Sequence, residues 1–268
     1  MNMVTHQAQN SVKGESYNIY QYQEQSYLPH FHKNFELAYL VCGTADFTVR
    51  NRTYAIDTGA FILVLPYELH SFQVYKGGKL LIIVFSENYI KTFSGMLHDK
   101  QGEVSVFQCS QPIRALFEEV MVKSYVKPTE SIESAPDLLL SKACLYAVCS
   151  EFLRSVPLHA KDQNTDLLIH ILNYIEQNFR EDISVKSAAK ELGYHHQYIS
   201  RIFNQTMHIN FKSLVNQYRF EYARRLLTDG SISISEAAFE SGFQSIRTFN
   251  RIYRELSGHS PRQRTPLS

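Results

Sequence analysis

The first third of the chain alternates short apolar runs with turn signals. β-Branched and aromatic residues predominate between Tyr17 and Phe85, and turns that contain glycine interrupt them at short intervals. This spacing is typical of a small antiparallel barrel or sandwich. Two of the runs, 60–65 and 80–85, are apolar throughout, which predicts strands that are covered on both faces. We therefore expect a β-barrel in this part of the chain.

Beyond residue 111 the apolar positions follow a helical period. Apolar side chains recur at spacings of three and four residues between 113 and 121, and again between 138 and 153. Such spacings place side chains on one face of a helix. Two amphipathic helices are thus predicted after the barrel, and from Asp166 onward the whole chain has helical character.

These elements define an α+β fold in two domains. The chain has 268 residues, which is enough for two hydrophobic cores. The polar stretch 156–165 is typical of an interdomain linker. We expect a domain with a β-barrel and two helices over 1–155, a linker over 156–165, and an all-α domain over 166–268.

The helical domain contains an internal repeat. Residues 184–194 align with 233–243 at an offset of 49, and residues 198–203 align with 248–253 at an offset of 50. Two copies are too few for a solenoid, which needs several stacked units to bury a continuous core. The repeat therefore indicates two copies of one compact helical motif.

Each copy has the features of a helix-turn-helix unit. Ser184 and Ser233 are suited to be N-caps at the start of a helix. The alanine pairs that follow allow a second helix to pack closely across the first. Gly193 and Gly242 then permit the tight turn that the motif requires.

The second helix of each unit is predicted to begin near His196 and near Ser245. Ile199, Ile202 and Phe203 would form the buried face in the first copy, and Phe249, Ile252 and Tyr253 in the second. Arg, Asn, Gln and Ser side chains can hydrogen-bond to base edges and phosphates, and Ile246 can contact a thymine methyl group. The predicted DNA-binding residues are His196, Gln197, Ser200, Arg201, Asn204, Ser245, Ile246, Arg247, Asn250, Arg251 and Arg254.

The segments 218–227 and 234–261 resemble the signature of the AraC/XylS family of transcription regulators. The resemblance covers about a hundred residues in register. It implies sequence-specific binding of double-stranded DNA by two recognition helices in successive major grooves, about 34 Å apart. It also implies a homodimer and an activator that contacts RNA polymerase and responds to a small-molecule effector, such as a sugar. One departure is His208, which stands where a glycine usually ends the first recognition helix.

The N-terminal barrel carries a group of histidines. His30, His32 and Glu36, followed by Pro66 and His70, are similar to the two signature segments of the cupin superfamily, although Glu68 stands where a glycine is expected. If the strand through the first segment is unbroken, positions 30, 32 and 36 share one face, here the barrel interior. His70 could join them from a neighbouring strand.

Three uses of His30, His32, Glu36 and His70 remain open. They could contact an organic effector, form structural hydrogen bonds at the barrel mouth, or hold a transition metal such as Zn, Fe or Mn. Barrels in the AraC family usually sense a ligand without metal, so the resemblance implies no cofactor. The fold alone cannot decide among these uses.

Charge and composition exclude some classes of protein. The net charge is only +1, but residues 166–268 carry 13 basic and 10 acidic side chains, against 14 and 16 in residues 1–165. This excess favours DNA binding by the C-terminal domain. No apolar run reaches the 20 or so residues needed to span a membrane. The four cysteines form no metal-finger pattern and are expected to be reduced, which favours a cytoplasmic location.

Two rival functions were considered. A metal-dependent cupin enzyme would leave the repeat unexplained, and the chain contains no catalytic triad order, phosphate loop or dinucleotide fingerprint. A regulator controlled by a protein partner would use the same DNA-binding domain. We therefore expect a regulator and no enzymatic activity.

Overall fold

The chain folds into two compact units. The computed structural model describes residues 5–6, 16–123, 138–228 and 232–261. The described residues up to Lys161 form the N-terminal unit, and those from Asp162 onward form the C-terminal unit, which also includes β1 (Thr5–His6). Each unit has its own hydrophobic core. The α+β prediction is confirmed.

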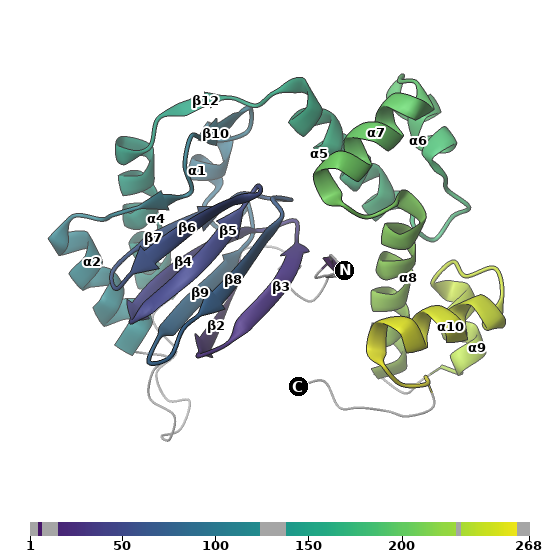
Figure 1. Ribbon diagram of the computed structural model, residues 1–268, viewed down its shortest axis with the longest axis horizontal. Coiled ribbons are helices and arrows are strands. Elements are labelled where there is room, and N and C mark those ends of the chain that lie inside the picture. The colour runs from purple at the N-terminus through teal and green to yellow at the C-terminus, as the bar shows by residue number, and fades with distance from the viewer. Residues whose placement is uncertain (1–4, 7–15, 124–137, 229–231, 262–268) are drawn as a thin grey trace. The chain divides into compact units, whose positions relative to one another are not determined.

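The N-terminal unit contains two antiparallel sheets that form an open, barrel-like arrangement (Figure 1). One sheet has the order β3-β8-β5-β6 within this unit, and the other has the order β11-β7-β4-β9-β2. The strands are β2 (Tyr17–Gln23), β3 (Ser26–Phe31), β4 (Phe35–Cys42), β5 (Thr44–Val49), β6 (Arg52–Asp57), β7 (Phe61–Val64), β8 (His70–Val74), β9 (Lys79–Phe85) and β11 (Val106–Phe107).

Strands β7 and β9 are covered on both faces, as their apolar runs predicted, and so is most of β4. Side chains on one face, such as Leu37 and Ile83, pack with α1 (Lys91–Met96), α2 (Gln111–Phe117), η2 (Glu118–Val122) and α4 (Leu138–Ser155). Side chains on the other face, such as Ala38 and Ile82, pack against the second sheet. The alternation places Glu36, which has the parity of Ala38, on the face that lies between the sheets.

The two predicted helices after the sheets are present. The first begins as α2 at Gln111 and continues into the π-helical turn η2, whose Val120, Met121 and Val122 are buried. The second is α4, which buries Leu145, Val148 and Phe152 against the same core. Both helices cover the outer face of the β4-containing sheet.

The stretch predicted to be a linker has regular structure over most of its length. Val156 is buried, and β12 (Leu158–Ala160) pairs with β10 (Lys100–Gly102). α5 (Gln163–Asn178) already begins at residue 163, with the Asp162 side chain accepting a hydrogen bond from the Thr165 backbone. The polarity of 156–165 therefore reflects an exposed edge strand and a helix N-cap, and the boundary between the units lies at residues 161–162.

The C-terminal unit is helical, as predicted. It contains α6 (Val185–Leu192), α7 (His196–Met207), α8 (Phe211–Thr228), α9 (Ile234–Glu240) and α10 (Ile246–Ser257). Figure 1 shows α8 running between the α6–α7 pair and the α9–α10 pair. Ser184 and Ser233 are N-caps with reciprocal capping-box hydrogen bonds, and Gly193 has a left-handed conformation with φ of 74°. These features confirm the two helix-turn-helix units.

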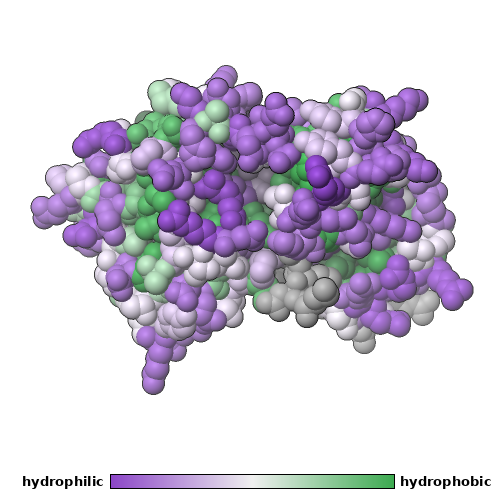
Figure 2. Space-filling view, turned by 45° about the horizontal axis from the view of Figure 1, so that its top comes forward, coloured by the Kyte–Doolittle hydropathy of each residue, from purple (hydrophilic) through white to green (hydrophobic). Residues whose placement is uncertain are grey.

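Hydrophilic side chains predominate on the face of the molecule shown in Figure 2, and hydrophobic ones occupy smaller areas between them. Among the described residues, no helix combines the length and the apolar composition that a membrane span requires.

Candidate functional site: a buried histidine cluster and two exposed helices

The structure brings His30, His32, Glu36 and His70 together inside the N-terminal unit. His30 lies at the end of β3, directly opposite His70, the first residue of β8. Glu36 lies on β4 in the other sheet, and all four residues are at most 2% exposed. The sequence placed positions 30, 32 and 36 on one face on the condition that one strand contains them all. In the structure the chain leaves β3 after Phe31 and enters β4 at Phe35. The residues converge because this turn carries the chain from one sheet to the other.

The possible ligand atoms of the cluster all lie within 4.8 Å of one another. His32 Nε2 is 3.0 Å from Glu36 Oε2, and His70 Nε2 is 3.5 Å from the same oxygen. Glu36 Oε1 and His70 Nε2 are buried and have no hydrogen-bond partner among the described residues. Buried polar atoms are usually paired, so these two indicate an additional binding partner, such as an ion or water.

The Nδ1 atom of every histidine in the cluster faces a backbone carbonyl. The distances are 2.9 Å from His30 to Leu28, 3.0 Å from His32 to Asn34, and 2.8 Å from His70 to Glu68. A carbonyl oxygen can only accept, so Nδ1 of His30 and Nδ1 of His70 each carry a proton, whereas the His32 ring also faces a second acceptor, the Glu36 carboxylate, through Nε2. These contacts fix the ring orientations and leave Nε2 of His32 and Nε2 of His70 facing Glu36.

Burial and charge make the three imidazoles unequal. Burial lowers the pKa of His30 and of His32 below the ordinary histidine value. Burial also opposes ionisation of Glu36, but the neighbouring His70 and His32 outweigh it and hold the Glu36 pKa below its usual range. Burial acts against protonation of His70 as well, yet the Glu36 carboxylate raises its pKa. The environment therefore favours an ionised Glu36 and neutral rings for His30 and His32, and it shifts His70 toward its protonated form.

This charge state leaves one hydrogen bond of His32 unmade. Its ring lies 3.0 Å from two acceptors, the Asn34 carbonyl oxygen and Glu36 Oε2. A neutral imidazole has a single N–H group and can donate to only one of them. If Nδ1 donates to Asn34, the Nε2 lone pair faces the carboxylate. A cation bound at that position would be attracted by both groups.

The cluster has a suitable set of donors for a divalent transition metal. Three imidazole nitrogens and one carboxylate oxygen are ligands for Zn, Fe or Mn, and the Nδ1 contacts supply the outer hydrogen bonds that metal-binding histidines usually make. An organic ligand would have to separate rings that already touch, since the His30 and His70 ring centroids are 4.1 Å apart.

Two residues beside the cluster did not emerge from the sequence as functional candidates. Arg50 Nε lies 3.0 Å from Glu68 Oε1, and the Glu68 side chain is only 10% exposed. Glu68 is also the residue whose carbonyl oxygen holds His70. The only signal in the sequence was that Glu68 replaces an expected glycine, and nothing there connected it with Arg50.

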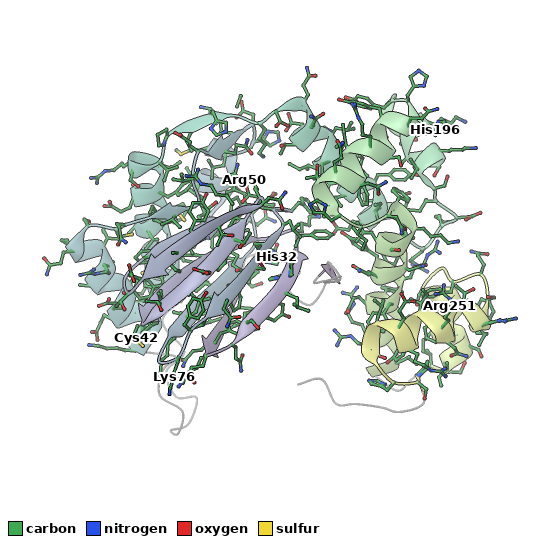
Figure 3. The ribbon with its side chains drawn as sticks, viewed as in Figure 1. His32, Cys42, Arg50, Lys76, His196 and Arg251 are labelled. Carbon is green, nitrogen blue, oxygen red and sulfur yellow. The ribbon has the colours of Figure 1, made fainter. Side chains whose placement is uncertain are left out.

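The predicted DNA-binding residues form one exposed face on α7 and one on α10. His196, Gln197, Arg201 and Asn204 are exposed on α7, and Arg247, Arg251 and Arg254 are exposed on α10. The opposite faces are buried, as expected. Figure 3 shows His196 and Arg251 on their helices with their side chains on the surface of the unit.

Four of the predicted contact residues already have structural partners. The Ser245 side chain caps α10 by accepting a hydrogen bond from the Thr248 backbone, and Ile246 is partly buried against the core. Arg251 forms an ion pair with Glu255 at 3.0 Å. The Arg201 guanidinium lies over the Tyr198 ring. Ser200 and Asn250 are half-buried, and Asn250 lines a surface groove along α10 with Arg247 and Arg254.

Comparison with known protein families accounts for both units. A model of an AraC-like ligand binding domain matches residues 13–143, and a model of a helix-turn-helix domain matches residues 179–264. The chain belongs to the AraC family of transcription regulators. This family consists of regulators and not enzymes, so the interpretation as a metal-dependent enzyme is set aside.

Relatives of this AraC-family protein carry the same general description. The sequence is 24% identical over 250 residues to the HTH-type transcriptional regulator YfiF of Bacillus subtilis, covering 87% of this chain and 77% of YfiF. It is 20% identical over 229 residues to an HTH-type transcriptional regulator of Staphylococcus aureus, covering 85% of this chain. The match spans only 31% of the length of that relative.

Solved structures of ToxT from Vibrio cholerae have the same fold. One ToxT structure superimposes with a TM-score of 0.58 at 15% sequence identity, covering 92% of this chain and 96% of ToxT. A structure of ToxT bound to an unsaturated fatty acid has a TM-score of 0.54 at 13% identity and covers 92% of each chain. These similarities show the two-domain fold.

Proposed function

We propose that this AraC-family protein is a metal-responsive transcription regulator. In this proposal α7 and α10 bind promoter DNA, and a divalent transition-metal ion bound by His30, His32, Glu36 and His70 is the effector. The main support is the geometry of the cluster, in which Nε2 of His32 and Nε2 of His70 lie 3.0 and 3.5 Å from Glu36 Oε2 and the possible ligand atoms of all four residues lie within 4.8 Å of one another. Without a cation, a neutral His32 ring can donate to only one of its two acceptors, and two buried polar atoms lack hydrogen-bond partners among the described residues.

The other properties implied by the family stay predictions. Activation through RNA polymerase rests on the resemblance alone, as does a sugar effector, which is the alternative to a metal. A cytoplasmic location rests on the cysteine pattern. A homodimer has one structural support, because Leu139 and Leu140 at the start of α4 are 75% and 46% exposed. A large apolar side chain at the surface is a common feature of subunit interfaces. Sedimentation of the double variant Leu139→Asp with Leu140→Asp should show a monomer if these residues lie in the interface.

The test combines metal binding with DNA binding by the full chain. The DNA is a duplex that the protein itself selects from a pool of random sequences. We expect calorimetry to find about one equivalent of Zn²⁺ bound, and DNA affinity to rise about tenfold when Zn²⁺ is present, within the usual range of coupling between sites. His32→Ala and Glu36→Gln should lose the metal and the response. His98→Ala is the matched control, because His98 is an exposed histidine of the same unit.

Each result has a distinct meaning. A wild-type protein that binds no Zn²⁺, Mn²⁺ or Fe²⁺ would rule out the metal effector. An unsaturated fatty acid, the ligand of one ToxT structure, serves as the organic alternative. If the fatty acid and not the metal changes DNA affinity, the cluster contributes to an organic site or to structure alone. Failure to select any duplex would contradict the DNA-binding role of α7 and α10.

A further inference from the structure

Arg50 connects three parts of the N-terminal unit. It occupies the two-residue turn between β5 and β6, where Arg50 and Asn51 both have positive φ. Its backbone N–H donates to the Leu69 carbonyl oxygen at 3.0 Å, and its Nε lies 3.0 Å from Glu68 Oε1. Its Nη2 donates to the carbonyl oxygen of Gly102, in β10, at 2.9 Å. In the view of Figure 3, Arg50 lies between His32 and the β10–β12 pair that Figure 1 labels.

The segment 65–69, to which Arg50 is bound, also contacts the histidine cluster. The Tyr67 N–H donates to the His32 carbonyl oxygen at 2.8 Å, and the Glu68 carbonyl oxygen accepts the proton of His70 Nδ1. Tyr67 has a φ of 66°, a conformation that is rare for a large side chain. Residues held in rare conformations persist only where their surroundings determine them, and they often occur at functional sites.

The β10–β12 pair leads directly to the DNA-binding unit. Gly102 pairs with Leu158, and the neighbouring Glu103 N–H donates to the Pro157 carbonyl oxygen. Lys161, the last residue of the N-terminal unit, donates from its backbone to Asp99 and from Nζ to the His98 carbonyl oxygen. The next residue, Asp162, is the N-cap of α5. β12 ends at Ala160, so only Lys161 and the N-cap Asp162 separate it from the first residue of α5, Gln163.

Binding of a metal would move donor side chains of the histidine cluster. The donor atoms are up to 4.8 Å apart, whereas the ligands of a tetrahedral ion with bonds of about 2.1 Å are only about 3.4 Å apart. At least one pair of donors must therefore move closer together when the ion binds. His70 is joined to the segment 65–69 through Nδ1, so a movement of His70 would be passed to Glu68.

We propose that Arg50 couples the histidine cluster to the DNA-binding unit. It does so by joining Glu68 and Leu69 to Gly102 and hence to the β10–β12 pair. This inference rests on the proposed function, because the signal it transmits is metal binding. The partners of Arg50 are Glu68, Leu69 and Gly102, which are neither proposed metal donors nor predicted DNA-binding residues, so Arg50 acts as a positioning residue.

The test compares Arg50→Asn with the matched control Arg52→Asn in the full chain. Asparagine tolerates the left-handed conformation at position 50, so the turn is kept while the guanidinium is removed. Arg52 belongs to the same hairpin, but its guanidinium lies over the Tyr54 ring. DNA affinity is measured with and without Zn²⁺, and Zn²⁺ affinity is measured separately by calorimetry.

We expect Zn²⁺ to change the DNA affinity of the wild type and of Arg52→Asn about tenfold, and that of Arg50→Asn less than about twofold. The Zn²⁺ affinity of Arg50→Asn should stay within about threefold of the wild type. A purely structural role would not separate these two readouts. An unchanged tenfold response in Arg50→Asn would overturn the proposal while leaving the proposed function intact.

A second measurement is informative even if Arg50→Asn folds poorly or if Zn²⁺ does not change the DNA affinity of the wild type. Hydrogen exchange of the wild-type amides of Glu103 and Lys161 reports directly on the β10–β12 region, because these amides donate to Pro157 and Asp99. We expect saturating Zn²⁺ to change both exchange rates at least about threefold. Unchanged rates would refute the coupling. Changed rates without a DNA response would retain a coupling between the cluster and the β10–β12 pair and refute metal control of DNA binding. A change of the same size in Arg50→Asn would refute the role of Arg50 in that coupling.

Discussion

Gly242 packs so closely against Arg180 that a Cβ atom at position 242 would lie under 3.0 Å from three backbone atoms of Arg180. Arg180 precedes α6 of the first helix-turn-helix unit, and Gly242 lies in the turn of the second. The Arg180 side chain also forms an ion pair with Glu240 at 3.0 Å. Arg219 of α8 donates to the Phe179 and Glu181 carbonyl oxygens beside it. These contacts hold the two helix-turn-helix units together along α8.

Gly242→Ala should destabilise the C-terminal unit and weaken DNA binding that requires both recognition helices. The residue has a φ of 87°, and the added methyl group meets backbone atoms that cannot turn aside. We expect a loss of about 2–4 kcal/mol in the free energy of unfolding.

Gly193→Ala is the matched control. It occupies the equivalent turn of the first unit, has a φ of 74°, and has nothing within 4 Å of its added Cβ. Only the backbone cost of about 1–2 kcal/mol should remain. Equal losses in the two variants, measured by urea denaturation, would show that the contact with Arg180 does not matter.

The C-terminal unit could be predicted from the sequence in detail because its determinants are local. Capping serines, the glycine turns and helical periodicity each act over a few residues, and the repeat displays them twice. The contacts of Arg180 and Arg219 could not be predicted, since they join residues 40 to 60 positions apart without a periodic signal.

The sequence predicted which residues form the histidine cluster, but not how they are arranged. The motif spacing pointed to His30, His32, Glu36 and His70, but the assumed unbroken strand was wrong, because the chain changes sheets at residues 32–34. The orientation of each ring depends on backbone carbonyls whose positions follow from the fold. The connection of Arg50 to Glu68 and Gly102 depends on three separate hairpin and edge-strand contacts, which a single sequence does not reveal.

Arg201→Ala and Arg251→Ala should each weaken specific DNA binding by about 1–3 kcal/mol if the guanidinium contacts a guanine. Arg251 must first leave Glu255, but an exposed pair four residues apart on a helix contributes only about 0.3–0.5 kcal/mol. Arg254→Ala should instead weaken binding to all sequences and lower the salt dependence by about one unit, since we expect it to contact phosphate. Fluorescence anisotropy titrations of DNA at several salt concentrations separate the two effects. Unchanged binding in all three variants would contradict the assignment of α7 and α10 as the DNA-binding helices.

His208→Gly should stabilise the protein. His208 ends α7 in the left-handed conformation with a φ of 51°, where its N–H donates to the Asn204 carbonyl oxygen. Glycine adopts this conformation without steric cost, although it loses more backbone entropy on folding. We expect a net gain of about 0.5–1 kcal/mol in urea denaturation. Gly258 ends α10 in the same conformation, so Gly258→His should lower the free energy of unfolding by a similar amount. A loss of stability in His208→Gly would mean that the histidine side chain makes a compensating contact.

The stability of the metal-free protein should fall as the pH is lowered from 7 to 5. The pKa values of buried His30 and His32 are lowered in the folded state, so the unfolded chain binds more protons below its own histidine pKa of about 6.5. The raised pKa of His70 acts in the opposite direction, since its contribution is present at low pH and is lost as the pH rises. Because two histidine pKa values are lowered and one is raised, we expect a net loss of stability toward pH 5.

His30→Asn isolates one part of this pH dependence. Its amide group can still donate to the Leu28 carbonyl oxygen, as His30 Nδ1 does at 2.9 Å, but it does not titrate. Urea denaturation in the presence of a chelator at pH 7, 6 and 5 should therefore show a smaller loss of stability in His30→Asn than in the wild type. His98→Asn, which replaces an exposed histidine of the same unit, is measured as the matched control. A wild-type protein that becomes more stable toward pH 5 would mean that the protonated Glu36–His70 pair dominates the cluster.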